Sequence, residues 1–343
     1  MEITKKNFGK LAIGEEVIEY ILKNEKLQVN VLNYGGIITK LYAPDKNGKM
    51  ENVVLGYDNL EDYLNKSPYF GAIIGRHAGR ISNAEFKLNG EVYQLAANEN
   101  ENNLHGGTGL DKRIWEVTEL ENGLELSYFS PHLEEGFPAD VEFTVRYLLI
   151  DDTLEIEYVA IPDRETIINL TNHTYFNLSG EAKTDILNHE LKIESAKFLA
   201  LDEKSMPTGE IREVEGTPFD FREFKEIGKE IAADYRQLEY TGGYDHPYVL
   251  ENGEDSIILK DKESGRVLVM STDQAVVVFY AGNQMRQEDQ GVLNSGQEAR
   301  KHLALCLETQ DYPDAINVDS LATKTYTPEK IYRAKTSYKF YID

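Results

Sequence analysis

The chain has 343 residues, with 36 Lys and Arg against 60 Asp and Glu, so its formal net charge is −24 at pH 7. A surface of this sign repels phosphate backbones and anionic lipids, and we expect neither nucleic acid nor a membrane as a partner. The single cysteine, Cys306, excludes an internal disulfide and a zinc or iron–sulfur site built from cysteines. The amino-terminal segment lacks the apolar core and cleavage site of a signal peptide, which predicts a cytoplasmic protein.

Alternating apolar and polar residues predict strands along most of the chain, at 27–35, 123–130, 141–150, 153–161, 266–273, 275–282, 301–310 and 337–342. Turn sequences such as Asn89-Gly90 separate the runs at the spacing of hairpins. Helical spacing is rare and predicts only a turn or two at 59–64 and a helix over 223–238, where Ile227 and Ile231 repeat. No linker, repeat or low-complexity tract divides the chain. The pattern predicts an all-β protein, one large antiparallel β-sandwich spanning 1–343 as a single domain.

Four polar positions along the chain are candidates for chemistry. His105 stands before a Gly-Gly pair, where backbone approaches a ligand closely, although such a pair is also an ordinary loop. His173 lies in the run TNHTYFNL, where strand alternation places it on one face with Thr171, Tyr175 and Asn177; a hydrogen-bonded structural histidine is the alternative.

The other two candidates are carboxylates. Asp245 follows a Gly-Gly turn, where it presents its carboxylate to a ligand or caps the turn. Glu308 ends the apolar strand KHLALCLETQ, where burial would raise its pKa towards that of a useful base, whereas a strand end in water would leave it ordinary. Cys306 shares the face of Glu308, and a lone thiol there is most simply packing.

Sequence motifs for metalloprotease, disulfide, serine-hydrolase and nucleotide chemistry are absent. The remaining set is two histidines, two carboxylates and an arginine on a β scaffold. Such a set performs acid–base chemistry on a polar neutral molecule without a metal or cofactor.

Taken in order, the motifs of the whole chain resemble those of the aldose 1-epimerase family. They include NYGGIITKLYAPDKNG, GAIIGRHAGRISNAEFKLNG, NNLHGG, TNHTYFNLSG, GGYDHPY, VVVFYAGN and LETQDYPDAIN. The resemblance implies a sandwich of the galactose-mutarotase type that interconverts the α and β anomers of free aldohexoses such as D-galactose and D-glucose. It implies a monosaccharide as the partner and no cofactor or metal. No motif indicates an oligomeric state.

The resemblance also implies roles for individual residues. His173 is the general acid that protonates the ring oxygen of the sugar, and Glu308 is the general base at the anomeric hydroxyl. His105 lies beside the ring oxygen and the anomeric centre, and Arg80 and Asp245 bind hydroxyls. Tyr280 lines the pocket, with its neighbour Phe279 as the alternative. We also expect Thr171 and Tyr175 to orient the imidazole of His173.

One position departs from the family pattern, and three rival functions remain. Gly79 stands where many relatives carry asparagine, which affects sugar preference more than chemistry. A glycoside hydrolase would use Asp245 and Glu308 as its carboxylate pair. A sugar-binding module would have no need of an acid–base pair. A hexose-6-phosphate epimerase would need cations at the phosphate, for which Arg76, Arg80, Lys112 and Arg113 are the candidates.

Overall fold

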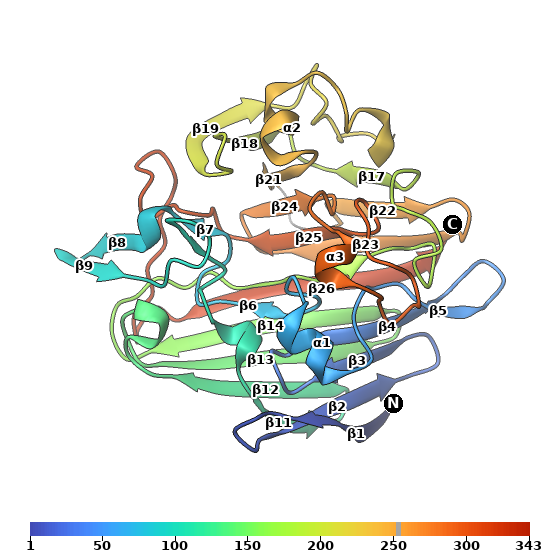
Figure 1. Cartoon of the computed structure of the whole chain (residues 1–343), viewed down its shortest axis with the longest axis horizontal. Helices are drawn as coiled ribbons and strands as arrows, with labels where there is room; N and C mark the ends of the chain where they lie inside the picture. Colours follow the sequence, from blue (N-terminus) through green and yellow to red (C-terminus); the bar gives the residue numbers. More distant parts are fainter. Residues whose placement is uncertain (252–254) are drawn as a thin grey trace.

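The computed structural model describes residues 1–251 and 255–343, which form stacked antiparallel sheets (Figure 1). The largest sheet in these ranges has nine strands, in the order β11 (Glu116–Leu120), β12 (Gly123–Ser130), β13 (Val141–Ile150), β14 (Thr153–Pro162), β26 (Tyr332–Ile342), β23 (Arg266–Thr272), β22 (Ile257–Asp261), β17 (Glu190–Ile193) and β20 (Lys225–Glu226). The all-β prediction and the predicted strands are confirmed.

Two smaller sheets and three strand pairs complete the β structure. The amino-terminal sheet runs in the order β1 (Glu2–Lys10), β2 (Glu16–Lys23), β3 (Gln28–Leu32), β4 (Ile38–Pro44) and β5 (Met50–Asn52). A six-stranded sheet has the order β16 (Tyr175–Phe176), β25 (Leu305–Gln310), β24 (Val276–Tyr280), β21 (Asp245–Val249), β18 (Lys197–Leu201) and β19 (Pro207–Glu213). The pairs are β6 (Ile73–Ile74) with β15 (Thr171–Asn172), β7 (Arg80–Ile81) with β10 (Asn103–Leu104), and β8 (Glu85–Leu88) with β9 (Glu91–Gln94).

Helices are short. The α-helices of the described residues are α1 (Leu60–Asn65), α2 (Arg236–Thr241) and α3 (Gln287–Gln290), and the 3₁₀ helices are η1 (Ser82–Ala84), η2 (Leu110–Lys112), η3 (Glu134–Gly136) and η4 (Ile227–Lys229). None of them, within these ranges, has the length and apolar character that a membrane crossing requires.

Of the two predicted helical segments, the first is confirmed and the second is wrong for most of its length. The side chain of Asn59 caps α1 by accepting a hydrogen bond from the Asp62 backbone. In the second segment, β20 adds instead to the edge of the nine-stranded sheet, and the turn at η4 contains Gly228, which disfavours a helix. Helix α2 therefore starts only at Arg236.

The main hydrophobic core lies between the nine-stranded sheet and the other two sheets. One continuous cluster contains Leu41 of the amino-terminal sheet, Tyr147 of the nine-stranded sheet and Phe279 of the six-stranded sheet. Strand alternation then leaves the opposite face of the six-stranded sheet available for a site. Figure 1 shows β21, β24 and β25 side by side, with the segment of β7 to β9 next to one end of them.

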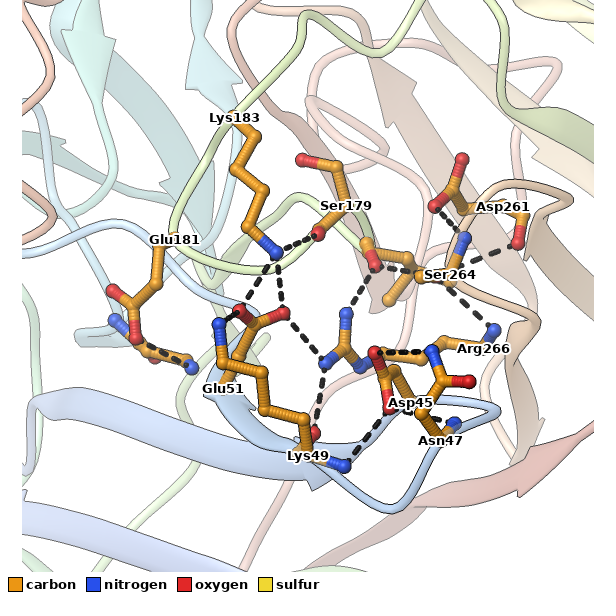
Figure 2. Close-up of polar contacts among 12 residues, drawn as sticks. Asp45, Asn47, Lys49, Glu51, Ser179, Glu181, Lys183, Asp261, Ser264 and Arg266 are labelled. Atoms are coloured by element: carbon orange, nitrogen blue, oxygen red, sulfur yellow. Dashed lines mark hydrogen bonds and ion pairs between the residues drawn. The ribbon is translucent and has the colours of Figure 1, made fainter.

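A buried ion cluster joins the sheets away from that face (Figure 2). Glu51 on β5 accepts hydrogen bonds from Lys183 at 2.6 and 2.7 Å, from Arg266 at 3.0 Å, and lies 2.5 Å from the amino group of Lys49. Arg266 also donates to the carbonyl of Leu178 at 3.0 Å. These four charged residues, the Glu51 cluster, connect β5, β23 and the segment that follows β16.

The carboxylate of Glu51 stays charged in the Glu51 cluster because more than one cation contacts it. Burial by itself would raise the pKa of Glu51, but the hydrogen bonds from Lys183, Lys49 and Arg266 outweigh it and lower that pKa to about 2. Glu51 and Arg266 are both nearly inaccessible to solvent, so neither charge could be left alone.

We expect Glu51→Gln to lower the free energy of unfolding by about 3–5 kcal/mol, since it leaves buried Arg266 without its counter-charge. Denaturant unfolding followed by circular dichroism measures the change. The matched control is Glu119→Gln, which removes the exposed 3.6 Å pair with Lys5 and should change stability by about 0.5 kcal/mol or less. Equal midpoints for the two variants would contradict the assigned role of the Glu51 cluster.

Candidate active site

The segment that carries His173 is not the continuous strand that its alternation predicts. Residues Thr171 and Asn172 pair with β6, whereas Tyr175 and Phe176 pair with β25, so the chain changes partner at His173. The backbone of His173 donates to the carbonyl of Ala72 at 2.9 Å and accepts from Gly71 at 3.0 Å. These two bonds fix the histidine at the junction, with its side chain in a cavity.

Stacked aromatic rings hold the imidazole of His173. The ring of Tyr175 lies 5.1 Å from it at an interplanar angle of 24°, and the ring of Tyr69 lies 5.7 Å away at 29°. The predicted orienting role of Tyr175 agrees with this contact. The prediction for Thr171 is wrong, because its buried hydroxyl has no hydrogen-bond partner among the described residues. Asn177 turns away as well and donates to the carbonyls of Thr184 and Leu303.

Glu308 reaches the same cavity from β25. Its Oε1 atom lies 3.5 Å from Nε2 of His173, slightly beyond the usual length of a hydrogen bond. Both side chains are about 5% exposed. Burial raises the pKa of Glu308 well above its usual range, helped by the charge of Asp245 and opposed by Arg80. Burial also lowers the pKa of His173 to about 4.

The two opposite pKa shifts decide where the proton resides in this pair. Because burial disfavours both charged forms, the neutral pair of carboxylic acid and imidazole is preferred over the ion pair. The two arrangements differ by one proton transfer and carry the same net charge. Glu308 and His173 therefore form a unit that can exchange a proton without changing the charge of the cavity.

His105 lies edge-on to His173, with ring centroids 5.2 Å apart. Its backbone donates to the carbonyl of Gly79 at 3.0 Å, and the Gly79 backbone donates to Nδ1 of His105 at 3.2 Å. Since a backbone N–H can only donate, Nδ1 is the acceptor and the neutral ring carries its proton on Nε2. Burial, together with the charges of His173 and Arg80, lowers the pKa of His105 well below its usual value, which keeps the ring neutral.

The glycine at position 79 has a structural reason. Its φ of +78° is the left-handed region that favours glycine, and a Cβ atom there would lie 2.7 Å from Cβ of Pro313. A side chain at this position would therefore need Pro313 to move. The close packing of Pro313 against position 79 thus accounts for a glycine, and not an asparagine, at this position.

Arg80 and Asp245 also line the cavity. The guanidinium of Arg80 donates twice to Glu99, at 2.6 and 2.8 Å, in the forked geometry that fixes its plane. Burial raises the pKa of Asp245 to about 6, with Arg80 acting in the opposite direction. Both groups can bond sugar hydroxyls, Arg80 as a donor and Asp245 as an acceptor.

Strand register explains why these residues meet. Asp245 pairs with Tyr280, Tyr280 with Cys306, and Cys306 with Tyr175, so the four side chains form one row across the six-stranded sheet. Glu308, two residues beyond Cys306, lies on the same face.

The cavity has a volume of about 320 Å³ and brings together all six predicted site residues. They are Arg80, His105, His173, Asp245, Tyr280 and Glu308. The choice between the neighbouring aromatics is also resolved, because Tyr280 lines the cavity whereas Phe279 is fully buried in the core.

Two residues of the site escaped sequence reasoning. Tyr69 adopts a φ of +67° in the turn whose backbone bonds to His173. The centroid of its ring also lies 4.8 Å from that of His105. In the sequence, this turn could have been inferred from Pro68 and Gly71, which flank Tyr69 and Phe70. Glu99, the partner of Arg80, lies in the polar run ANENENN, where nothing distinguishes one acidic residue from another.

The cations needed for a phosphate are not in the cavity. Among the described residues that line it, Arg80 is the one Lys or Arg, beside four carboxylates. Arg76 is buried elsewhere and donates to Ser130 and the carbonyl of Pro138. Lys112 and Arg113 pair with Asp111 and Glu134.

One set of side chains could hold a metal ion. Ligand atoms of His105, His173 and Glu308 all lie within 4.8 Å of one another. Two histidines and one carboxylate suit several divalent cations. Two of these residues, His173 and Glu308, also form the pair that exchanges a proton, so metal binding and proton transfer at this site are competing uses.

Comparison with known proteins gives one consistent result. A family model described as aldose 1-epimerase matches residues 19–339. Galactose mutarotase of Bos taurus is 40% identical over 347 residues, covering 100% of this chain and 99% of that protein, and aldose 1-epimerase of Escherichia coli (strain K12) is 33% identical over 303 residues, 86% of each. The crystal structure of galactose 1-epimerase from Lactobacillus acidophilus NCFM superposes with a TM-score of 0.87 at 26% identity over 99% of both chains.

We expect His173 of the sugar-free protein to remain neutral at pH 6 and to gain a proton only near pH 4, because burial disfavours the charged ring. Ring NMR signals, assigned with His173→Asn, measure the titration. The unfolded chain, with a histidine pKa of about 6.5, binds more protons than the folded chain between these values. The contribution of this residue to stability is therefore complete above pH 6.5 and declines towards pH 4. A midpoint at or above 6.5 would contradict the assignment.

Proposed function

The chain belongs to the aldose 1-epimerase family, and from this premise we propose that it interconverts the α and β anomers of free aldohexoses such as D-galactose and D-glucose. The observation that carries the proposal is the buried contact of 3.5 Å between His173 and Glu308 in a cavity of about 320 Å³. A carboxyl and an imidazole that share one proton are the two groups that ring opening of a hemiacetal requires.

The reaction begins when the shared proton lies on His173. Glu308 then removes the proton of the anomeric hydroxyl, while Nε2 of His173 delivers its proton to the ring oxygen. The bond between the anomeric carbon and the ring oxygen breaks, and a carbonyl forms at the anomeric carbon. The site now holds the open-chain aldehyde, protonated Glu308 and neutral His173.

The second half of the reaction reverses these transfers. Rotation about the adjacent carbon–carbon bond presents the other face of the carbonyl to the hydroxyl that becomes the ring oxygen. His173 takes the proton of that hydroxyl and Glu308 returns its own to the anomeric oxygen. Because burial prefers the neutral pair, the enzyme stabilises the open-chain stage relative to the same groups in water.

The other cavity residues bind and orient the sugar. His105 directs the Nε2–H of its neutral ring at the ring oxygen and anomeric centre, where it stabilises charge that develops in the transition state. Arg80, fixed by Glu99, donates to hydroxyls, and Asp245 accepts from them. Tyr280 and Tyr69 provide apolar surface for the carbon skeleton of the sugar.

The rival functions fit this cavity less well. Among the described lining residues Arg80 is the one Lys or Arg, and its charge is already paired with Glu99, which disfavours the hexose-6-phosphate epimerase. A pure binding module has no use for a buried carboxyl next to a buried imidazole. The glycoside hydrolase remains testable, because Asp245 and Glu308 both line the cavity; we expect no release of nitrophenol from nitrophenyl galactosides.

We also propose that residues 1–343 act as one domain, supported by a family match over 19–339, and that the protein works in the cytoplasm, supported by its single buried cysteine. No nucleic acid or membrane takes part.

Freshly dissolved α-D-galactose and α-D-glucose should reach their equilibrium rotation faster with the protein, as measured by polarimetry in a weakly catalytic buffer. Glu308→Gln and His173→Asn should each reduce the enzymatic rate by about 10²–10⁴-fold, because each removes one proton carrier. Glu119→Gln, on the edge strand β11, is the matched control and should leave the rate unchanged. A fully active Glu308→Gln variant would refute the mechanism.

Treatment with EDTA followed by dialysis into metal-free buffer should leave the polarimetric rate unchanged, since both proton carriers belong to the protein. A rate that falls and returns on adding Zn²⁺ would instead assign a cation to His105, His173 and Glu308. The control is the same dialysis without chelator.

A further inference from the structure

Cys306 is the one cysteine of the chain, and the proposed reaction does not use it. It is fully buried on β25, in the strand row between Tyr175 and Tyr280. The rings of these two tyrosines lie 6.0 Å apart, edge to face. The sulfur is therefore enclosed on the cavity side of the sheet, next to the working residues.

The sulfur of Cys306 contacts the imidazole of His173 directly. Sγ lies 3.4 Å from Nδ1, within the range of a hydrogen bond to sulfur. Nε2, the other ring nitrogen, faces Glu308. Tyr69 and Tyr175 cover the two faces of the ring, so Cys306 and Glu308 together define its rotation within its own plane.

A thiol is chemically suited to this position. Its sulfur accepts weakly from Nδ1–H, both in an imidazolium and in a neutral imidazole whose proton lies on Nδ1. Burial, together with the charges of Glu308 and Asp245, raises the pKa of Cys306 well above its usual value, so it remains a thiol. A carboxylate at this place would hold the imidazolium form, which would hinder His173 from giving up its proton.

Resting on the proposed function, we propose that Cys306 is a positioning residue for His173. By accepting from Nδ1–H it keeps the proton of the neutral ring on Nδ1, so that Nε2, the nitrogen that faces Glu308 and the sugar, is free to take up a proton. When the ring is charged, the same contact from Nδ1–H to sulfur persists and the ring does not need to turn. The thiol thus supports both protonation states that the reaction alternates between.

The direct test is the tautomer of His173, read from long-range ¹H–¹⁵N correlation spectra near pH 7. The protein has seven histidines, and His173→Asn identifies the signal. In the wild-type protein we expect a neutral ring with its proton on Nδ1. In Cys306→Ala we expect a mixture of the two tautomers, and in Cys306→Ser recovery of the Nδ1 form, since a hydroxyl also accepts.

Activity gives the second readout. Cys306→Ala should lower kcat by on the order of tenfold, because His173 loses the hydrogen-bond partner of its Nδ1 atom. KM should remain unchanged. Cys306→Ser should recover a part of this loss. Val277→Ala is the control, because it removes volume from the core side of the neighbouring strand without touching His173.

The outcomes separate the two proposals. A wild-type ring with its proton on Nε2, or a Cys306→Ala ring unchanged from the wild type, would overturn the role of Cys306 whatever the activity. The expected tautomers in a protein without mutarotase activity would support the positioning role and reject the proposed function. If Val277→Ala lost as much kcat as Cys306→Ala, the kinetic effect would come from lost packing volume and would contradict a positioning role for Cys306.

Discussion

Burial of Glu308 against His173 is the constraint on which the site depends. In water a carboxyl and an imidazole would both be charged near pH 6, but in this cavity each charge alone is disfavoured. The pair resolves the conflict by sharing one proton at constant net charge. A reaction that opens and recloses the same ring must run equally well in both directions. A symmetric exchange of one proton through the sugar meets that requirement.

The surrounding fold holds this pair rigidly. One face of the six-stranded sheet packs on the core, so the other face can present Tyr175, Cys306 and Glu308 with little freedom. The backbone of His173 is bonded to the turn at Tyr69, and the segment beyond it is attached to both neighbouring sheets through the Glu51 cluster (Figure 2). Positioning of this kind is the main contribution that a scaffold makes to acid–base chemistry.

Charge distribution agrees with a neutral polyol as the ligand. The chain carries a formal net charge of −24, and in the cavity the charge of Arg80 is matched by Glu99. An anionic ligand would have to approach against this net charge, whereas hydroxyl groups can bond both to carboxylates and to a guanidinium.

Local pattern was enough to predict the strands and to mark His105, His173, Asp245 and Glu308 as candidates, because alternation along a strand and glycine-flanked turns are properties of neighbouring residues. Their individual roles came from the resemblance to the family. The break at His173, the stacking of Tyr69, the pairing of Arg80 with Glu99 and the contact between Cys306 and His173 were decided only by the tertiary structure. Each joins segments that are far apart in the chain, and such contacts depend on how the sheets pack, which leaves no periodic signal in the sequence. The sequence by itself therefore indicated which residues could carry chemistry, and only the fold decided how they lie relative to one another.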